Sequence, residues 1–148
     1  MDCSDPISAS CHCGQLRLSL RLPTEATACS PRHCDCDYCV MHGAAWVSDP
    51  AGALHILTPD PAMLGRYRQG ARLAEFLFCT RCGVLVAAIH EVDGRRLGVA
   101  NARLFAATLA FGPATAVSPK SLAPHDKAQR WQRLWFQHVT IRSGDPRR

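Results

Sequence analysis

Two cysteine pairs, far apart in the sequence, constrain this chain more than any other feature. The first pair is Cys11 and Cys13 in "CHCG", and the second is Cys79 and Cys82 in "CTRCG". The glycine after each pair can adopt the backbone angles that a tight turn requires. At these spacings both thiolates of a pair can reach one tetrahedral ion, so the two pairs predict a closed, four-sulfur structural zinc site. Packing of the thiols as small hydrophobic groups is the alternative that the paired spacing disfavours.

A third cysteine cluster lies in "CDCDYC", where Cys34, Cys36 and Cys39 fall within six residues. Three thiols are one ligand short of a closed zinc site, and three ligands with an open fourth position are typical of a catalytic zinc. A fourth protein ligand would instead make the site structural, and the candidates nearby are His33, His42, Asp35 and Asp37. We interpret the remaining cysteines, Cys29 and Cys3, as a packed core thiol and a thiol of the N-terminal segment.

Composition and the N-terminal residues indicate which cellular compartment and which classes of binding partner to expect. The chain has 148 residues, enough for one domain over 1–148, and nine cysteines. Its first ten residues, "MDCSDPISAS", lack the features of a signal peptide, so we expect a cytoplasmic protein whose clustered cysteines bind metal rather than form disulfides. Thiolate ligands to two zinc ions lower the formal charge from +5 to about +2. With no interleaved basic and aromatic face and no run of about 20 apolar residues, neither nucleic acid nor a membrane is an expected partner.

The hydrophobic pattern predicts an all-β fold, mainly antiparallel. After Gly14, the leucines at 16, 18, 20 and 22 alternate with polar residues, which is typical of a half-buried strand. Asp93-Gly94 predicts a hairpin with a type I′ turn. Many short strands at close spacing favour a sandwich or an open barrel. Further strands are expected at 26–32, 44–48, 54–57, 64–69, 72–78, 84–90 and 96–100.

The C-terminal part is expected to hold a connector and one helix. Residues 112–124, "GPATAVSPKSLAP", are rich in proline and small residues and predict an irregular connector. The segment "HDKAQRWQRLWFQH" predicts a helix with Asp126 as its N-cap. Its apolar stripe is expected to pack on the domain or on a second subunit, so a homodimer through this helix is one possibility. The stripe consists of Ala128, Trp131, Leu134, Trp135 and His138.

Three motifs in order resemble one known family. "SCHCG" at 10–14, "CDCDYC" followed by "HGAAW" at 34–46, and "FCTRCG" at 78–83 are similar to the glutathione-dependent formaldehyde-activating (GFA) enzymes, which are grouped with centromere protein V-like proteins. The resemblance covers about 7–105. It implies a β-tent fold of packed small sheets with two zinc ions, in a single GFA-like domain with a core at about 7–111 and a connector plus helix at 112–148. The resemblance also implies a structural zinc at Cys11, Cys13, Cys79 and Cys82, and a catalytic zinc at Cys34, Cys36 and Cys39.

The function that the resemblance implies is carbon–sulfur chemistry on a small thiol. Enzymes of this family condense glutathione with formaldehyde to S-hydroxymethylglutathione, and in reverse they are carbon–sulfur lyases. One departure concerns the residues directly after the third cysteine, which are basic in many relatives and here read Val40-Met41-His42. A cation for a glutathione carboxylate must then come from elsewhere. The candidates for the substrate pocket are His33, His42 and Trp46, with Arg32 as a further cation.

A second class of function competes with the enzyme. The β-tent architecture also serves proteins that bind partners without catalysis, and a fold alone does not choose between the two. In an enzyme, the zinc of the three-cysteine cluster keeps one coordination position open, whereas in a zinc-stabilised binding module for a protein partner both ions are closed or the second is absent.

Overall fold

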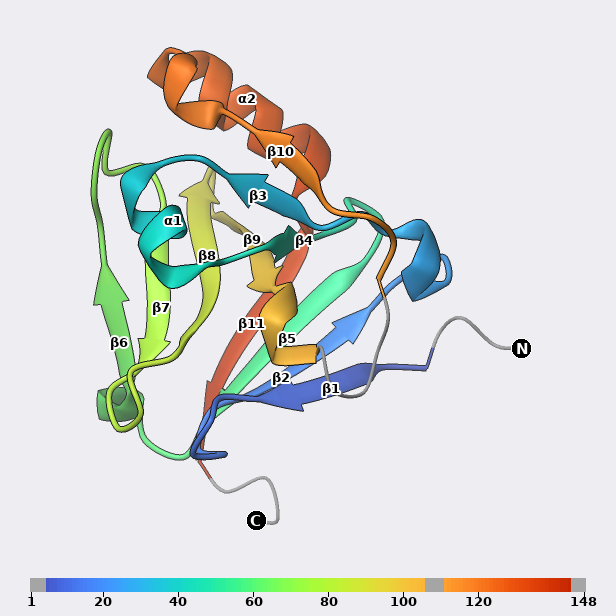
Figure 1. The fold of residues 1–148 in the computed structure, drawn as a ribbon. Helices are drawn as coiled ribbons and strands as arrows, with labels where there is room; N and C mark the ends of the chain where they lie inside the picture. Colours follow the sequence, from blue (N-terminus) through green and yellow to red (C-terminus); the bar gives the residue numbers. More distant parts are fainter. Residues whose placement is uncertain (1–4, 106–110, 145–148) are drawn as a thin grey trace.

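The computed structural model describes residues 5–105 and 111–144, which form two sheets (Figure 1). The smaller sheet has four strands in the order β1-β2-β5-β11, and the larger has seven in the order β10-β3-β4-β9-β8-β7-β6. Neighbouring strands are antiparallel except in the pairs β10–β3 and β11–β5. The smaller sheet comprises β1 (Ile7–Ser10), β2 (Arg17–Arg21), β5 (Ala53–Thr58) and β11 (His138–Ser143). The larger sheet comprises β3 (Arg32–Cys34), β4 (Trp46–Val47), β6 (Leu64–Tyr67), β7 (Glu75–Cys79), β8 (Leu85–Val92), β9 (Arg95–Asn101) and β10 (Thr115–Val117).

The main hydrophobic core lies between the two sheets. The leucines at 16, 18, 20 and 22 are all buried there, as their alternation predicts. They meet Leu77, Ile89 and Phe105 from the side of the larger sheet. The mainly antiparallel β class with packed small sheets is therefore confirmed.

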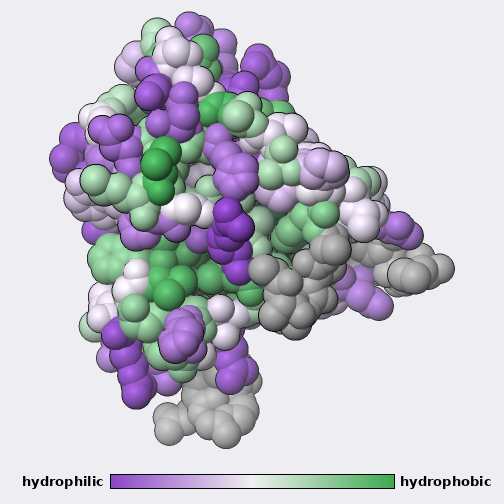
Figure 2. All heavy atoms as spheres, in the orientation of Figure 1, coloured by the Kyte–Doolittle hydropathy of each residue, from purple (hydrophilic) through white to green (hydrophobic). Residues whose placement is uncertain are grey.

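The other face of the larger sheet carries a second hydrophobic cluster and the helices. Helix α1 (Asp37–His42) follows β3 directly, and helix α2 (Pro124–Leu134) crosses above the sheet in Figure 1. Trp131 and Trp135 belong to this cluster and pack with Phe76 of β7. Polar side chains dominate over α2 on the face seen in Figure 2. The apolar stripe of the helix thus packs on its own chain, one of the two expected outcomes, and a homodimer through α2 stays a prediction.

The turn between β8 and β9 has the predicted conformation. Asp93 and Gly94 both have positive φ, 51° and 74°, which a type I′ turn requires at both central positions.

Several local predictions were wrong. Of the strand expected at 26–32, residues Ala26–Ala28 form a short 3-10 turn, and pairing starts only at Arg32, after a proline that offers no backbone N–H. The expected connector 112–124 contains β10, which pairs with β3. Helix α2 begins two residues before Asp126, with Pro124 in its first turn and no side-chain cap.

The helix also ends earlier than predicted, so that His138 begins β11. Cys3 lies outside the described residues. No helix among the described residues is both long and apolar enough to cross a bilayer.

Candidate metal centres and the adjoining cavity

The two distant cysteine pairs meet in the structure. The Sγ atom of Cys13 lies 3.6 Å from that of Cys11 and 3.6 Å from that of Cys79, although Cys13 and Cys79 are 66 positions apart. Together with Cys82, the four sulfurs lie within 4.8 Å of one another. This four-cysteine cluster ties the β1–β2 connection to the β7–β8 connection.

Both connections have the same backbone construction. The amide of Gly14 donates to the carbonyl of Cys11 at 3.0 Å, and the amide of Gly83 donates to that of Cys79 at 2.8 Å. The two glycines have φ of 83° and 80°, a conformation that residues with a Cβ rarely adopt. Backbone amides also point at the sulfurs, from Leu16 to Cys11 Sγ at 3.3 Å and from Cys82 to Cys79 Sγ at 3.5 Å. The turns therefore hold the sulfurs in place and supply hydrogen bonds that stabilise thiolates.

The geometry of the four-cysteine cluster fits a tetrahedral zinc ion. A Zn–S distance of about 2.3 Å implies sulfur–sulfur edges of about 3.8 Å, close to the 3.6 Å separations in the cluster.

The thiols of the four-cysteine cluster differ in their pKa values. Burial raises the pKa of Cys11 to about 11. Desolvation also acts to raise the pKa of Cys82, but hydrogen bonds from the backbone of Cys13 and Val84 and from the thiols of Cys79 and Cys11 together outweigh it and lower that pKa to about 6.

The three-cysteine cluster of Cys34, Cys36 and Cys39 forms where β3 ends and α1 begins. Cys36 is the N-cap of α1, and its Sγ accepts a hydrogen bond from the amide of Cys39 at 3.4 Å. The indole Nε1 of Trp46 donates to Cys39 Sγ at 3.4 Å. Among the described residues, no histidine, aspartate or glutamate joins these three sulfurs. The donor set is therefore three thiols, which fits a zinc ion with one coordination position left for another ligand.

Ionisation within this cluster is uneven. Hydrogen bonds from the thiols of Cys34 and Cys39 lower the pKa of Cys36 to about 2. The same interaction with Cys36 raises the pKa of Cys34, and interactions with Cys34 and Cys36 raise that of Cys39. One thiolate, stabilised by two thiols and a helix N-terminus, is thus the preferred state without a cation. A bound cation would favour ionisation of all three.

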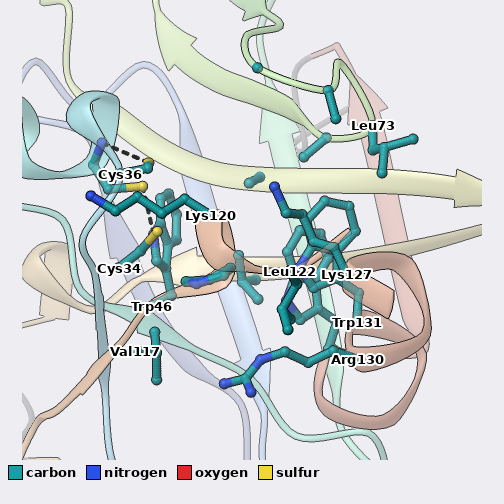
Figure 3. A pocket seen from close by; sticks show the side chains of 18 of the residues that line it. Cys34, Cys36, Trp46, Leu73, Val117, Lys120, Leu122, Lys127, Arg130 and Trp131 are labelled. Atoms are coloured by element: carbon teal, nitrogen blue, oxygen red, sulfur yellow. Dashed lines mark hydrogen bonds between the residues drawn. The ribbon is translucent and has the colours of Figure 1, made fainter. Parts of the chain in front are cut away.

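A cavity of about 390 Å³ opens on the three-cysteine cluster. All three cysteines line it at one end, together with the ring of Trp46. In Figure 3 the side chains of Lys127, Arg130 and Trp131, all from α2, lie at the other end. The four-cysteine cluster does not line this cavity. Of the two cysteine clusters among the described residues, the three-cysteine cluster is therefore the one that combines an incomplete ligand set with space for a small molecule.

The predicted pocket residues take different places. Trp46 lines the cavity, as do all three cysteines and Arg32. His33 and His42 are not among its lining residues, and His42 is exposed at the end of α1, with its ring 4.6 Å from that of Tyr38.

The two aspartates considered as ligands do not join the three-cysteine cluster, and Cys29 belongs to neither cluster. Asp37 is exposed, and Asp35 lies 4.0 Å from Lys120, measured from Oδ2 to Nζ. Cys29 contacts the carbonyl of Ser48 at 3.8 Å.

Residues that the sequence analysis missed supply most of the charged wall. Lys120, Lys127 and Arg130 line the cavity, as does Arg72 from the turn before β7. The helical spacing held a signal for two of them, because positions 127, 130, 131 and 134 share one face of a helix. The apolar stripe on that face does not by itself indicate a role for the cations interleaved with its tryptophan and leucine.

Comparisons with known proteins decide the family. The family model described as "Glutathione-dependent formaldehyde-activating enzyme" (GFA) matches residues 6–120. The chain belongs to this family. The match includes both cysteine clusters and ends before α2 begins.

One solved structure shares the fold of this GFA-family chain. A crystal structure of a Rhodobacter sphaeroides protein matches with a TM-score of 0.53 and 19% sequence identity, covering 92% of this chain and 100% of the other. Among curated proteins, none matches the chain.

Proposed function

We propose that this protein is a zinc-dependent enzyme that forms or cleaves the carbon–sulfur bond of a small thiol–aldehyde adduct of the S-hydroxymethylglutathione type. The observation that carries the proposal is the cavity that opens on a cluster of three cysteines with no fourth ligand among the described residues. Family membership supports the same class of reaction.

The residues have separate roles in this proposal. Cys34, Cys36 and Cys39 would hold the catalytic zinc, and Cys11, Cys13, Cys79 and Cys82 would hold a structural one. A zinc ion in the three-cysteine cluster supplies Lewis-acid chemistry, since it lowers the pKa of a bound thiol and polarises an aldehyde oxygen. In the forward direction the thiol sulfur bonds to the aldehyde carbon, and the thiol proton ends on the aldehyde oxygen. The reverse direction breaks that carbon–sulfur bond and restores both reactants.

Surrounding residues orient the cluster and exclude water. Trp46 donates its indole N–H to Cys39, and Gln69 reaches Cys36 Sγ at 3.9 Å from the turn that borders the cavity. Such bonds orient metal ligands and tune their basicity. Phe76 and Trp131 add apolar surface to the cavity wall. A thiol held there is shielded from bulk water on the sides that these rings cover.

The direct test measures the reaction on zinc-loaded protein. Because thiols and formaldehyde combine without a catalyst, the measurement is the exchange rate between free and S-hydroxymethyl thiol by NMR, with and without protein. We expect faster exchange with the parent and with Cys29→Ser, whose thiol lies outside both clusters. We expect the uncatalysed rate with Cys36→Ala. If the parent leaves the rate unchanged for every thiol tested, the non-catalytic binding module becomes the better interpretation.

A cytoplasmic location stays a prediction.

A further inference from the structure

Apart from its cysteines, the cavity beside the three-cysteine cluster is lined by charged side chains of positive sign only. Five of its lining residues are cationic, and among the described residues that line it none is an aspartate or glutamate. The cationic residues are Arg32, Arg72, Lys120, Lys127 and Arg130. Away from the cysteines, such a wall favours anions and disfavours a positive group.

The cations of α2 are available to a ligand, as is Arg72, which is exposed and forms no ion pair within the described part of the chain. Lys120 is partly neutralised by Asp35 at 4.0 Å. By contrast, Lys127 and Arg130 form no ion pair within the described part of the chain. Both are half-buried against the cavity.

Arg32 adds a fixed charge beside Arg130. Its Nη2 donates to Ser48 Oγ at 2.6 Å, and Ser48 in turn donates to the carbonyl of Leu134 at 2.6 Å. Burial and the charge of Arg130 both lower the pKa of Arg32. An anion near these two guanidinium groups would relieve their repulsion, and guanidinium groups bind carboxylates through paired hydrogen bonds.

Apart from its cysteines and cations, the wall of the cavity is mostly apolar and aromatic. Trp46 and Phe76 lie 6.2 Å apart between ring centroids, and Trp131 and Trp135 are stacked at 4.5 Å. Leu73, from the turn before β7, also lines the cavity. Such a wall suits a flat apolar group better than a peptide backbone, whose polar atoms would lose hydrogen bonds to water there.

We propose that this cavity selects a thiol whose sulfur is joined through a flat apolar spacer to a carboxylate, with no ammonium group, and that Lys127 and Arg130 bind that carboxylate. The proposal rests on the proposed function, because it places the sulfur at Cys34, Cys36 and Cys39. Glutathione fits this wall less well, since away from the cysteines its ammonium group would meet only cations. The selecting residues lie on α2, beyond the region that matches the family model.

Calorimetric titration of the zinc-loaded full chain tests both ends of the cavity separately. The probes are 4-(mercaptomethyl)benzoate, its counterpart with a methyl group in place of the carboxylate, its counterpart with an aminomethyl group there, 4-methylbenzoate without the thiol, and glutathione. We expect 4-(mercaptomethyl)benzoate to bind tightest. The neutral thiol should bind about ten-fold more weakly, because it lacks a charge-assisted hydrogen bond. The ammonium thiol and glutathione should bind more weakly than the carboxylate thiol as well.

Variants of α2 locate the effect. Arg130→Gln should weaken binding of the carboxylate thiol about ten-fold and leave the neutral thiol unchanged. Lys127→Gln is a second variant for the same readout. Arg133→Gln is the matched control, because Arg133 is exposed on the same helix and does not line the cavity.

The possible failures are distinguishable. Equal binding of the carboxylate and neutral thiols, tightest binding of glutathione, or an equal effect of Arg130→Gln on charged and neutral thiols would overturn the specificity. Loss of the thiol contribution, with 4-methylbenzoate binding as tightly as 4-(mercaptomethyl)benzoate, would instead overturn the proposed function and with it the placement of sulfur at the cysteines.

Discussion

Replacement of Cys79 by serine should remove the metal that joins the two halves of the fold. Cys79 is fully buried, and its Sγ lies 3.6 Å from that of Cys13, which is 66 positions away. The chain-entropy relation for a cross-link that closes a loop of this length gives about 4 kcal/mol of stabilisation. A chain of this size loses roughly 2–4 °C of melting temperature per kcal/mol, so the loss should reach at least about 8–16 °C.

The assay combines metal content with thermal unfolding by circular dichroism. The parent should carry two zinc ions, one for each cluster, and Cys79→Ser should carry close to one or be insoluble. Cys29→Ser is the matched control, because it removes a half-buried thiol that belongs to neither cluster. If Cys79→Ser keeps both zinc ions and has the same melting temperature as Cys29→Ser, the four-cysteine cluster is not a structural metal site.

Three further perturbations test how the second site is built. Cys36→Ala should stay folded, carry about half the zinc and lose thiol binding, because the three ligands of this zinc site span only six residues and close no long loop. Unfolding as complete as that of Cys79→Ser would show that the three-cysteine site is structural instead. Trp46→Phe should lower zinc affinity at this site by about ten-fold in a chelator competition, since it removes the indole N–H donated to Cys39, and an unchanged affinity would contradict that role. Ser48→Ala should reduce the free energy of unfolding by about 1–3 kcal/mol in urea, because it removes the hydrogen bonds that Ser48 makes with Arg32 and with the carbonyl of Leu134; no change in midpoint would show that water replaces the hydroxyl.

The parts of the structure that local chemistry determines could be predicted from the sequence. The glycine after each cysteine pair predicts a tight turn, and the turns at Gly14 and Gly83 have the expected left-handed backbone. The alternating leucines of β2 identify a buried face without knowledge of what covers it. In each case the signal spans fewer than ten residues, and the tertiary structure did not override it.

The pairing of the C-terminal strands could not be predicted in this way. The strand β11 has a half-polar sequence, "HVTIRS", yet it pairs in parallel with β5 over all six of its residues. Its register depends on where α2 ends, and parallel pairing leaves no hairpin signal in the sequence. Strand β10 is similar, because only its three residues pair with β3, inside a stretch rich in proline.

These two strand pairings explain why the sequence alone does not predict the charged end of the cavity. The strand β10 leads into α2 and β11 leaves it, so the helix is held over the larger sheet at both ends (Figure 1). Helical spacing alone puts Lys127 and Arg130 on the same face as Trp131, but it does not say what that face meets. Once α2 lies over the sheet, that face points into the cavity, and Ser48 ties the carbonyl of Leu134 to Arg32 beside the cysteines. The residues directly after Cys39 supply no lysine or arginine, whereas α2 brings Lys127 and Arg130 to the cavity, so no single segment of the chain encodes its lining.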